Sequence, residues 1–325
     1  RPRSLPMDLL NRIFLEPWVE MAAAPDFLLQ VVWEGLVSGV LYALIALGFV
    51  LIFRSSRIFN FAQGIMVVFA ALTLVGLHEM GVPAWIAVAG TLAVMFALAW
   101  TVERVVLRPL VGQPDIILFM ATIGLTLFLI GLGETIFGGE NRQMITEELG
   151  IPTGDFVLEP GGGLLILQHI DVTAVVVAGL LVVALLAFLN FTRMGRAVRA
   201  LGDDHQAALS VGISLQTIWV LVWFIAGIIA LVTGIAWGSR AGVSFALEII
   251  AYKALPVLML GGLESITGAI VGGLMIGVLE KIFEIYWGAP LLGGGTEAWF
   301  AYVLALLVLL YRPQGLFGEK IIERV

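Results

Sequence analysis

Eight or nine stretches of this chain are apolar enough to enter a lipid bilayer, and four of them contain no charged side chain. A transmembrane helix needs about 20 predominantly apolar residues, and most of the stretches reach that length. Inside lipid every backbone polar group must be satisfied within a helix or a closed barrel. The sequence therefore predicts an all-α, polytopic transmembrane helix bundle. The predicted spans cover residues 27–53, 61–77, 84–102, 115–137, 172–192, 213–239, 249–263, 265–285 and 297–311.

Composition supports this fold class. Hydrophobic residues make up 60% of the chain and charged residues only 13%, which leaves too little polar surface for a soluble domain of this size. The last spans are less regular, because Lys253 and Pro256 interrupt one and Lys281 and Glu284 interrupt the next. From sequence, residues 249–285 form either two full crossings or one broken pair.

The loop charges orient the bundle. With nine crossings, four segments share one side and hold ten of the seventeen basic residues. The positive-inside rule makes that side cytoplasmic. These segments are residues 54–60, 103–114, 193–212 and 312–325.

Two outer segments follow from this orientation. Residues 138–171 form the longest external loop, with six acidic residues, and loops of that length are usually functional or flexible. Residues 1–26 lack a continuous apolar core and are expected to form an N-terminal extension with a short helix on the membrane surface. Residues 27–325 are expected to form a single transmembrane domain.

Several functional classes are excluded. The chain has no cysteine, and His78, His169 and His205 lie far apart, so no metal site is expected. The net charge is −7, with no basic face for nucleic acid. There is no Gly-x-x-x-x-Gly-Lys-Ser/Thr phosphate loop and no recognisable nucleophile motif, so the chain is expected to be neither an enzyme nor an ATP-binding subunit.

The cytoplasmic segment 193–212 is the most informative loop. It is long enough for one or two short helices outside the bilayer, and Arg196 and Arg199 fall on one helical face. Such a helix suits docking into a groove of a cytoplasmic partner. A positive-inside anchor would account for the arginines alone, so docking is the favoured interpretation. An anchor leaves the following residues of the segment unexplained: Asp203, Asp204, Ala207, Ala208 and the bracketing Gly202 and Gly212.

Polar groups within the predicted spans are the second set of candidates. Asn60, Phe61 and Gln63 open the second span, and membrane amides usually face the bundle interior or a cavity. A helix start in which Asn60 caps the first turn is the favoured reading of this short motif. Ionisable groups in spans are functional candidates, or members of structural ion pairs, and both possibilities stay open. These groups are Glu134, Glu248, Lys253 and Glu280, of which Lys253 lies deepest.

Glycines recur in the last third of the chain. Two small-xxx-small repeats, Gly268 with Gly272 and Gly273 with Gly277, let helices approach closely in lipid, and Gly261 with Gly262 lies just before them. Packing explains most of these glycines. A loosely locked glycine interface could also slide during transport.

Five motifs in the same order resemble the membrane permease subunits of bacterial ATP-binding-cassette (ABC) importers of the branched-chain amino acid type. The resemblance covers about residue 30 to the C-terminus. Gln63 stands where the family commonly has His, and Glu264 where it commonly has Gly. The motifs are Asn-Phe-Ala-Gln-Gly at 60–64, Glu103-Arg104 with Arg108-Pro109, Arg-Met-Gly-Arg at 193–196 with Arg199-Ala200, Gly-Gly-Leu at 261–263 with Ser265 and Gly268, and Arg-Pro-Gln-Gly-Leu-Phe-Gly at 312–318.

The resemblance implies a division of labour in the bacterial inner (cytoplasmic) membrane. A periplasmic binding protein would deliver a small polar solute of the branched-chain amino acid, amide, urea or small organic acid class. This chain and a second related permease would form the path, and two cytoplasmic ATPases would hold ATP and Mg²⁺, so this chain would carry no cofactor. The coupling helices would map onto residues 195–212. Their expected ATPase contacts are Gly195, Arg196, Arg199, Asp203, Asp204, Ala207 and Gly212.

An ion-coupled secondary transporter is the alternative. It would use Lys253, Glu134 and Glu280 as coupling groups but leaves segment 193–212 unexplained. In either case Asn60, Phe61, Gln63, Glu134, Glu248 and Lys253 are the candidates for the translocation path.

Overall fold

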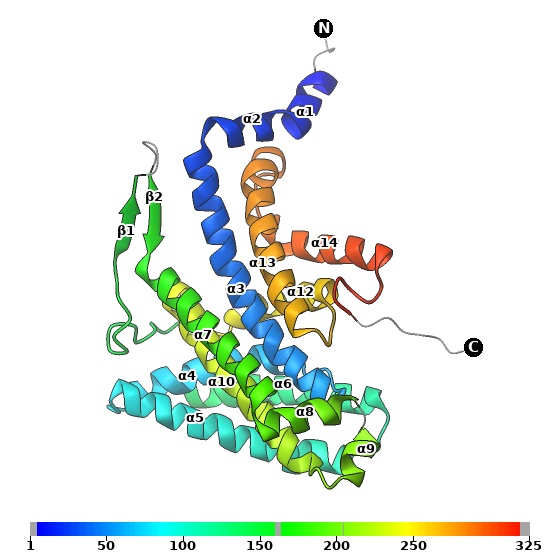
Figure 1. Ribbon diagram of the computed structural model, residues 1–325. Helices are drawn as coiled ribbons and strands as arrows, with labels where there is room; N and C mark the ends of the chain where they lie inside the picture. The colour runs from blue at the N-terminus through cyan, green and yellow to red at the C-terminus, as the bar shows by residue number, and fades with distance from the viewer. Residues whose placement is uncertain (1–4, 160–163, 204, 319–325) are drawn as a thin grey trace, which may run out of the picture.

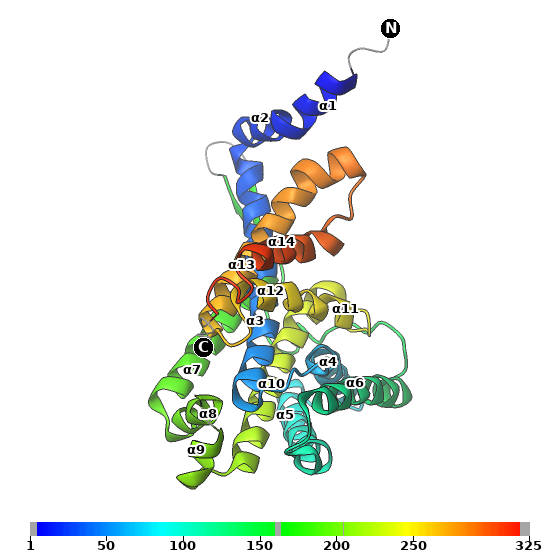
Figure 2. The same cartoon turned by 90° about the vertical axis from the view of Figure 1, so that its right-hand side faces the viewer.

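The computed structural model describes residues 5–159, 164–203 and 205–318, and a long central helix organises them. Helix α3 (Pro25–Ser56) runs between two groups of helices (Figures 1 and 2). One group contains α4 (Gln63–Glu79), α5 (Ala84–Thr101), α6 (Asp115–Phe137) and α10 (Leu215–Ala241). The other contains α12 (Ala254–Gly261), α13 (Ile266–Phe283) and α14 (Glu297–Tyr311).

The remaining helices cover the ends of the bundle. Helix α7 (His169–Phe191) crosses α3 and leads into two short helices, α8 (Arg193–Asp203) and α9 (His205–Ser210). Helices α1 (Leu5–Phe14) and α2 (Glu16–Ala23) turn aside from the axis of α3 at its start (Figure 1). Trp287 holds them in place, because its Nε1 donates to the Ile13 carbonyl at 2.9 Å.

The prediction of a polytopic helical bundle is confirmed. Six helices are long and apolar enough to cross a membrane, and α4 and α14 are shorter apolar helices. Together with the broken helix of residues 249–263, which is described next, these helices account for the expected eight or nine membrane segments. The six long helices are Pro25–Ser56, Ala84–Leu110, Ile116–Phe137, His169–Phe191, Leu215–Ala241 and Ile266–Leu292.

The ambiguous region is one broken helix followed by one continuous helix. Residues 249–263 are covered by α11 (Leu247–Tyr252) and α12, which meet at Lys253. Pro256 is tolerated in the first turn of α12, where its missing N–H leaves no hydrogen bond unmade. Helix α13 instead continues without a break into a π-helical segment, Glu284–Leu292. A second π-helical segment, Val102–Leu107, and a short 3₁₀ turn, Arg108–Leu110, extend α5.

Glycines let α3 and α13 pack with their backbones in contact. Gly35 and Gly39 of α3 face Gly273 and Gly277 of α13. A Cβ atom at Gly39 would lie 2.7 Å from the Gly273 carbonyl oxygen, and one at Gly35 would lie 2.7 Å from the Cα of Val278. We call these four residues the glycine seam. Such close approach is the usual way in which helices associate in lipid.

The other predicted glycine repeat serves a different helix. Gly268 lies against the backbone of Gly261 at the end of α12, and a Cβ atom at Gly272 would lie 3.0 Å from the Val257 carbonyl oxygen. Gly262 has a φ of +103°, which L-residues rarely adopt, and it turns the chain between α12 and α13. One face of α13 therefore packs on α3 and another face on α12.

A hairpin in the loop that the sequence predicts to be external departs from the all-α expectation. Strand β1 (Asp155–Leu158) pairs antiparallel with β2 (Leu165–Gln168), and Asp155 is opposite Gln168. The two strands contain apolar and β-branched residues on either side of a glycine-rich stretch, a pattern that suits a hairpin. Elsewhere in the same loop Arg142 exchanges two backbone hydrogen bonds with Val243, at 2.9 and 2.7 Å, and pairs with Glu79.

The seam makes a quantitative prediction. Gly39→Ala should destabilise the protein by about 1–3 kcal/mol, because the added methyl group collides with the α13 backbone. Gly124→Ala is the matched control, since Gly124 lies on α6 with no atom within 4 Å of the added methyl group. Thermal unfolding in detergent should show a lower midpoint for the first variant only. Equal midpoints would contradict the close contact.

Candidate functional site

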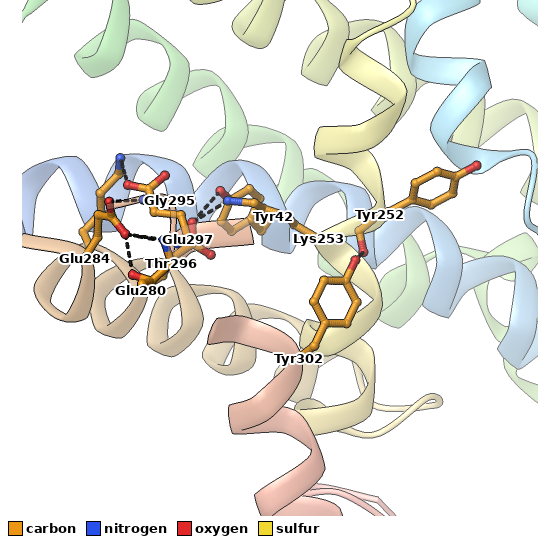
Figure 3. A network of polar contacts seen from close by, with 10 residues as sticks. Tyr42, Tyr252, Lys253, Glu280, Glu284, Gly295, Thr296, Glu297 and Tyr302 are labelled. Carbon is orange, nitrogen blue, oxygen red and sulfur yellow. Dashed lines mark hydrogen bonds and ion pairs between the residues drawn. The ribbon is translucent and has the colours of Figure 1, made fainter. Parts of the chain in front are cut away.

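A polar network joins the C-terminal part of α13 to three other elements (Figure 3). Lys253 Nζ lies 2.6 Å from Glu280 Oε1, and the Tyr42 hydroxyl donates to the same oxygen at 3.3 Å. The Glu280 side chain is 1% exposed and that of Lys253 17%. Buried carboxylates of this kind persist in a membrane bundle only when paired. The pair therefore fixes the helix break to α3 and α13.

Local structure explains why these three side chains meet. Lys253 occupies the junction between α11 and α12, so its side chain does not follow the face of either helix. The glycine seam brings α13 close enough to α3 for Tyr42 to reach Glu280. Lys253 Nζ also lies over the Tyr42 ring, 5.5 Å from its centre, a favourable cation–π distance.

The end of α13 and the start of the π-helical segment after it hold the start of α14. Lys281 Nζ lies 2.7 Å from Glu297 Oε1. Glu284 accepts hydrogen bonds from the backbone N–H groups of Gly295 and Thr296, both at 2.7 Å, and from the Thr296 hydroxyl. A carboxylate at a helix N-terminus satisfies free N–H groups and complements the helix dipole. These contacts fix α14 against α13 (Figure 3).

An aromatic and charged chain continues from Tyr42 to the outer end of α7. The Tyr42 ring stacks on Trp237 of α10 at 5.9 Å between centroids. The guanidinium of Arg240 lies 5.5 Å from the Trp237 ring centre, and Arg240 Nε lies 3.1 Å from Asp171 Oδ1. Each charged side chain in this row of contacts has a partner of opposite sign. The row therefore joins five elements without leaving one of its own charges unpaired.

The structure separates the predicted ionisable residues. Glu248 accepts from the Tyr252 hydroxyl at 2.5 Å, and Glu134 is exposed near the end of α6. Neither pairs with Lys253, whose partner is Glu280. Sequence reasoning named Glu280 but missed this pairing and the role of Tyr42, because 27 and 238 residues separate the partners of Glu280 from it.

The amide motif fixes the turn between α3 and α4. Asn60 Oδ1 accepts from the Ala62 N–H at 3.0 Å, and Gln63 Nε2 donates to the Ala226 carbonyl of α10 at 3.3 Å. Both side chains are fully buried. The Phe61 N–H donates to the Thr122 hydroxyl of α6 at 3.3 Å. Through these contacts the residues at the start of α4 join it to α6 and α10.

Helices α8 and α9 project beyond the ends of the spans, with one side of α8 buried. Val198 and Leu201 are buried, while Arg196 is exposed. Gly195 lies against the α7 backbone, where a Cβ atom would be 2.5 Å from the Cα of Leu189. The Gly195 N–H also donates to the Thr192 hydroxyl at 2.9 Å. Motion of α8 must therefore displace α7.

Arg57 connects α8 to the opposite half of the bundle. It ends α3 in the left-handed conformation, with φ of +57°, the one non-glycine residue with positive φ in the described part of the chain. Its Nη2 donates to the Gly202 carbonyl of α8 at 3.1 Å, and its Nη1 pairs with Glu264 in the loop before α13. Glu264 is one of the two positions, with Gln63, at which this sequence departs from the resembled family.

The other predicted contact residues of this segment are only partly described. Ala207 is exposed on α9, and Gly212, with φ of +83°, turns the chain toward α10. Arg199 donates to Asn190 Oδ1 at 3.1 Å. The Asp203 side chain and all of Asp204 lie outside the described residues.

Comparison with known families decides what kind of protein this bundle is. The family model "Branched-chain amino acid transport system / permease component" matches residues 31–311. The chain belongs to this family. It is therefore a permease component rather than an enzyme, and a multi-pass protein of the inner membrane.

Three curated relatives illustrate the range of the match. The permease is 32% identical over 91% of its length to the high-affinity branched-chain amino acid permease protein BraD of Pseudomonas aeruginosa, of which 98% is covered. It is 28% identical to LivH of Escherichia coli, a protein of the same description, over 92% of this chain and 98% of LivH. It is also 25% identical to the E. coli ribose import permease protein RbsC, over 82% of this chain and 79% of RbsC.

A solved structure shows a distant likeness. PsaBC from Streptococcus pneumoniae in complex with Fab covers 86% of the permease, and 91% of that chain is covered, with a TM-score of 0.44 and 11% identity. This likeness is too weak to define the fold.

The buried ion pair makes a prediction. Lys253→Met should destabilise the permease by about 3–5 kcal/mol, because it leaves Glu280 unpaired in the bundle interior. Adding Glu280→Gln should recover part of the loss. Unfolding of both variants in detergent measures the effect.

Lys281→Met is the matched control for this pair. Its partner Glu297 is 31% exposed, so water can solvate the remaining carboxylate and the loss should be smaller. If Lys253→Met alone and the double variant lose the same stability, the pair does not hold the helix break.

Proposed function

We propose that the permease is the membrane half of an ATP-driven importer, in which α8 and α9 dock on a cytoplasmic ATPase. The observation that carries the proposal is the exposed arginine face of a short helix that stands outside the spans yet is rigidly joined to them. Arg196 is exposed on α8, and the opposite side of the helix is packed on the bundle. A fixed helix with exposed charges suits recognition by a groove of a partner protein.

The contacts of α8 supply a route for force. The backbone contact at Gly195 joins α8 to α7, and Gly202 packs on the Arg54 carbonyl of α3. Arg57 adds a link to the start of α13 through Glu264. Closure of an ATPase dimer against α8 would thus act on three spans together, and rigid-body tilting of helices is a common form of alternating access.

The partners in this proposal are a second related permease, two ATPases and a periplasmic binding protein. ATP and Mg²⁺ belong to the ATPases, and no cofactor is assigned to this chain. Residues 27–325 act as one transmembrane domain, with residues 1–26 as an extension. The proposed solute is a branched-chain amino acid, as the descriptions of BraD and LivH suggest, while the match to a ribose permease shows that related chains carry other solutes.

The proposed path residues divide into two kinds. Four of them keep some exposed surface, so a passing solute could contact them: Phe61, Glu134, Glu248 and Lys253. Asn60 and Gln63 are fully buried and bonded to backbone groups, so we assign them to the wall that supports the path.

An ion-coupled secondary transporter is not favoured by the site. Coupling through the ionisable side chains named for this alternative needs a group that is free to bind and release the ion. Lys253 and Glu280 neutralise each other at 2.6 Å, and Glu134 lies apart on α6. A structural ion pair thus accounts for Lys253 and Glu280, two of the three groups that suggested this alternative.

The docking proposal predicts the effect of one charge reversal. Arg196→Glu should abolish solute uptake and the copurification of an ATPase, because it places like charge in the proposed contact. The variant should still reach the membrane, since Arg196 is exposed. Uptake by cells and pull-down in mild detergent measure both effects.

Arg104→Glu is the matched control, a reversal at an exposed arginine of the π-helical segment that extends α5, on the membrane side predicted to be the same. It should leave uptake and copurification at the level of the unchanged chain. Full transport by Arg196→Glu, with ATPase still bound, would overturn the docking assignment.

The energy source and solute are tested together. Uptake of labelled leucine should stop when cellular ATP is depleted and persist when ion gradients are collapsed but ATP is maintained. Unlabelled isoleucine and valine should compete, and ribose should not. Competition by ribose alone would refute the solute assignment, and loss of uptake with the ion gradient alone would favour secondary transport.

A further inference from the structure

A polar cavity of about 480 Å³ opens beside α8 at the predicted cytoplasmic face. The C-terminal ends of α3 and α7 form two of its sides, and α8 and the start of α13 form the others. The coupling route proposed above runs along its rim through Arg57, Gly202 and Glu264, but it assigns no ligand to the cavity. Its polar lining includes Arg54, Arg57, Asn190, Arg199, Glu264 and Thr267.

The cavity carries an excess of positive charge. Glu264 is the one carboxylate among the lining residues that the structure describes, and it pairs with Arg57. Arg199 donates to the neutral side chain of Asn190 at 3.1 Å. Among the described residues, neither Arg54 nor Arg199 has a carboxylate partner.

One wall of the cavity is apolar and continuous with the outer surface of α7. Leu186 and Leu189 line the cavity, and Asn190 follows them at the end of the helix. One and two turns away from the cavity, Val183 is 64% exposed and Leu180 is 65% exposed. Since α7 is a membrane span, this exposed apolar surface faces lipid tails.

We propose that the cavity binds the phosphate headgroup of an anionic phospholipid from the cytoplasmic leaflet, with an acyl chain along α7. Arg54 and Arg199 would contact the phosphate, because guanidinium groups match its oxygens in geometry and charge. Basic pockets between helices on the cytoplasmic side are suited to such headgroups. A free phosphate would use the arginines but not the apolar wall, and the apolar wall therefore favours a lipid.

The site would connect the lipid to α8. Arg199 and Gly202 belong to α8, and Arg57 holds both Gly202 and Glu264 at the rim of the same cavity. A bound headgroup would neutralise the arginines that otherwise repel one another across α3 and α8. Lipid binding would thus stabilise the position of α8 in the proposed ATPase contact.

Native mass spectrometry of the purified, full-length permease in detergent tests the site. Titration with phosphatidylglycerol should show one tightly bound lipid, whereas phosphatidylcholine and inorganic phosphate should not produce this complex. Arg54→Gln with Arg199→Gln should weaken binding about fivefold for each charge removed. Arg54→Lys keeps the charge but not the guanidinium geometry, so it should bind more tightly than Arg54→Gln and less tightly than the unchanged chain.

Two further variants distinguish loss of lipid binding at this cavity from a general effect of removing an arginine. Arg104→Gln removes an arginine from the same membrane side outside the cavity and should leave phosphatidylglycerol binding unchanged. Leu186→Trp fills the apolar wall without changing any charge and should weaken lipid binding.

The contrary results are equally specific. Equal binding of both lipids, or unchanged phosphatidylglycerol binding in the double arginine variant, would overturn the proposal. Binding of inorganic phosphate with the same affinity would show a soluble-anion site instead. Binding of neither lipid, with the cavity occupied by an acidic segment of a copurified subunit, would assign it to a protein contact.

Discussion

The backbone contact between α3 and α13 is the constraint on which the other features depend. Four glycines allow it, and a methyl group at either α3 position would meet α13 backbone atoms. Because the two helices are this close, Tyr42 reaches Glu280, and Glu280 in turn holds Lys253 at the helix break. The charges that first suggested ion coupling therefore follow from helix packing.

The same arrangement gives α8 its mechanical position. Helix α3 carries the glycine seam along its length and ends at Arg57, which contacts both α8 and the loop before α13. Tilting of α8 would be transmitted to α3 and α13 as a packed unit, since backbone-to-backbone contacts leave little room for side chains to absorb the motion. This is the physical basis of the proposed coupling between an ATPase and the transport path.

The sequence was sufficient to predict the spans, because lipid demands long apolar helices and these have a simple signature. The bounds predicted for residues 115–137 and 297–311 agree with α6 and α14. The hairpin at 155–168 was missed because short strands in a glycine-rich loop give a weak pattern. The pairing of Lys253 with Glu280 could not be predicted, because it depends on the rotation of α13 about its axis. The motifs at 193–212 and 261–268 could be recognised because their glycines and arginines stand at fixed spacings.

Crosslinking from a single cysteine tests the central claim, that α8 is the contact with an ATPase. The chain has no native cysteine, so Arg196→Cys gives one defined attachment point on α8, and Arg104→Cys gives one on another cytoplasmic loop. In membranes that contain the whole assembly, a short thiol crosslinker should join the first variant to an ATPase subunit and the second far less. Crosslinking from position 104 but not from position 196 would contradict the account.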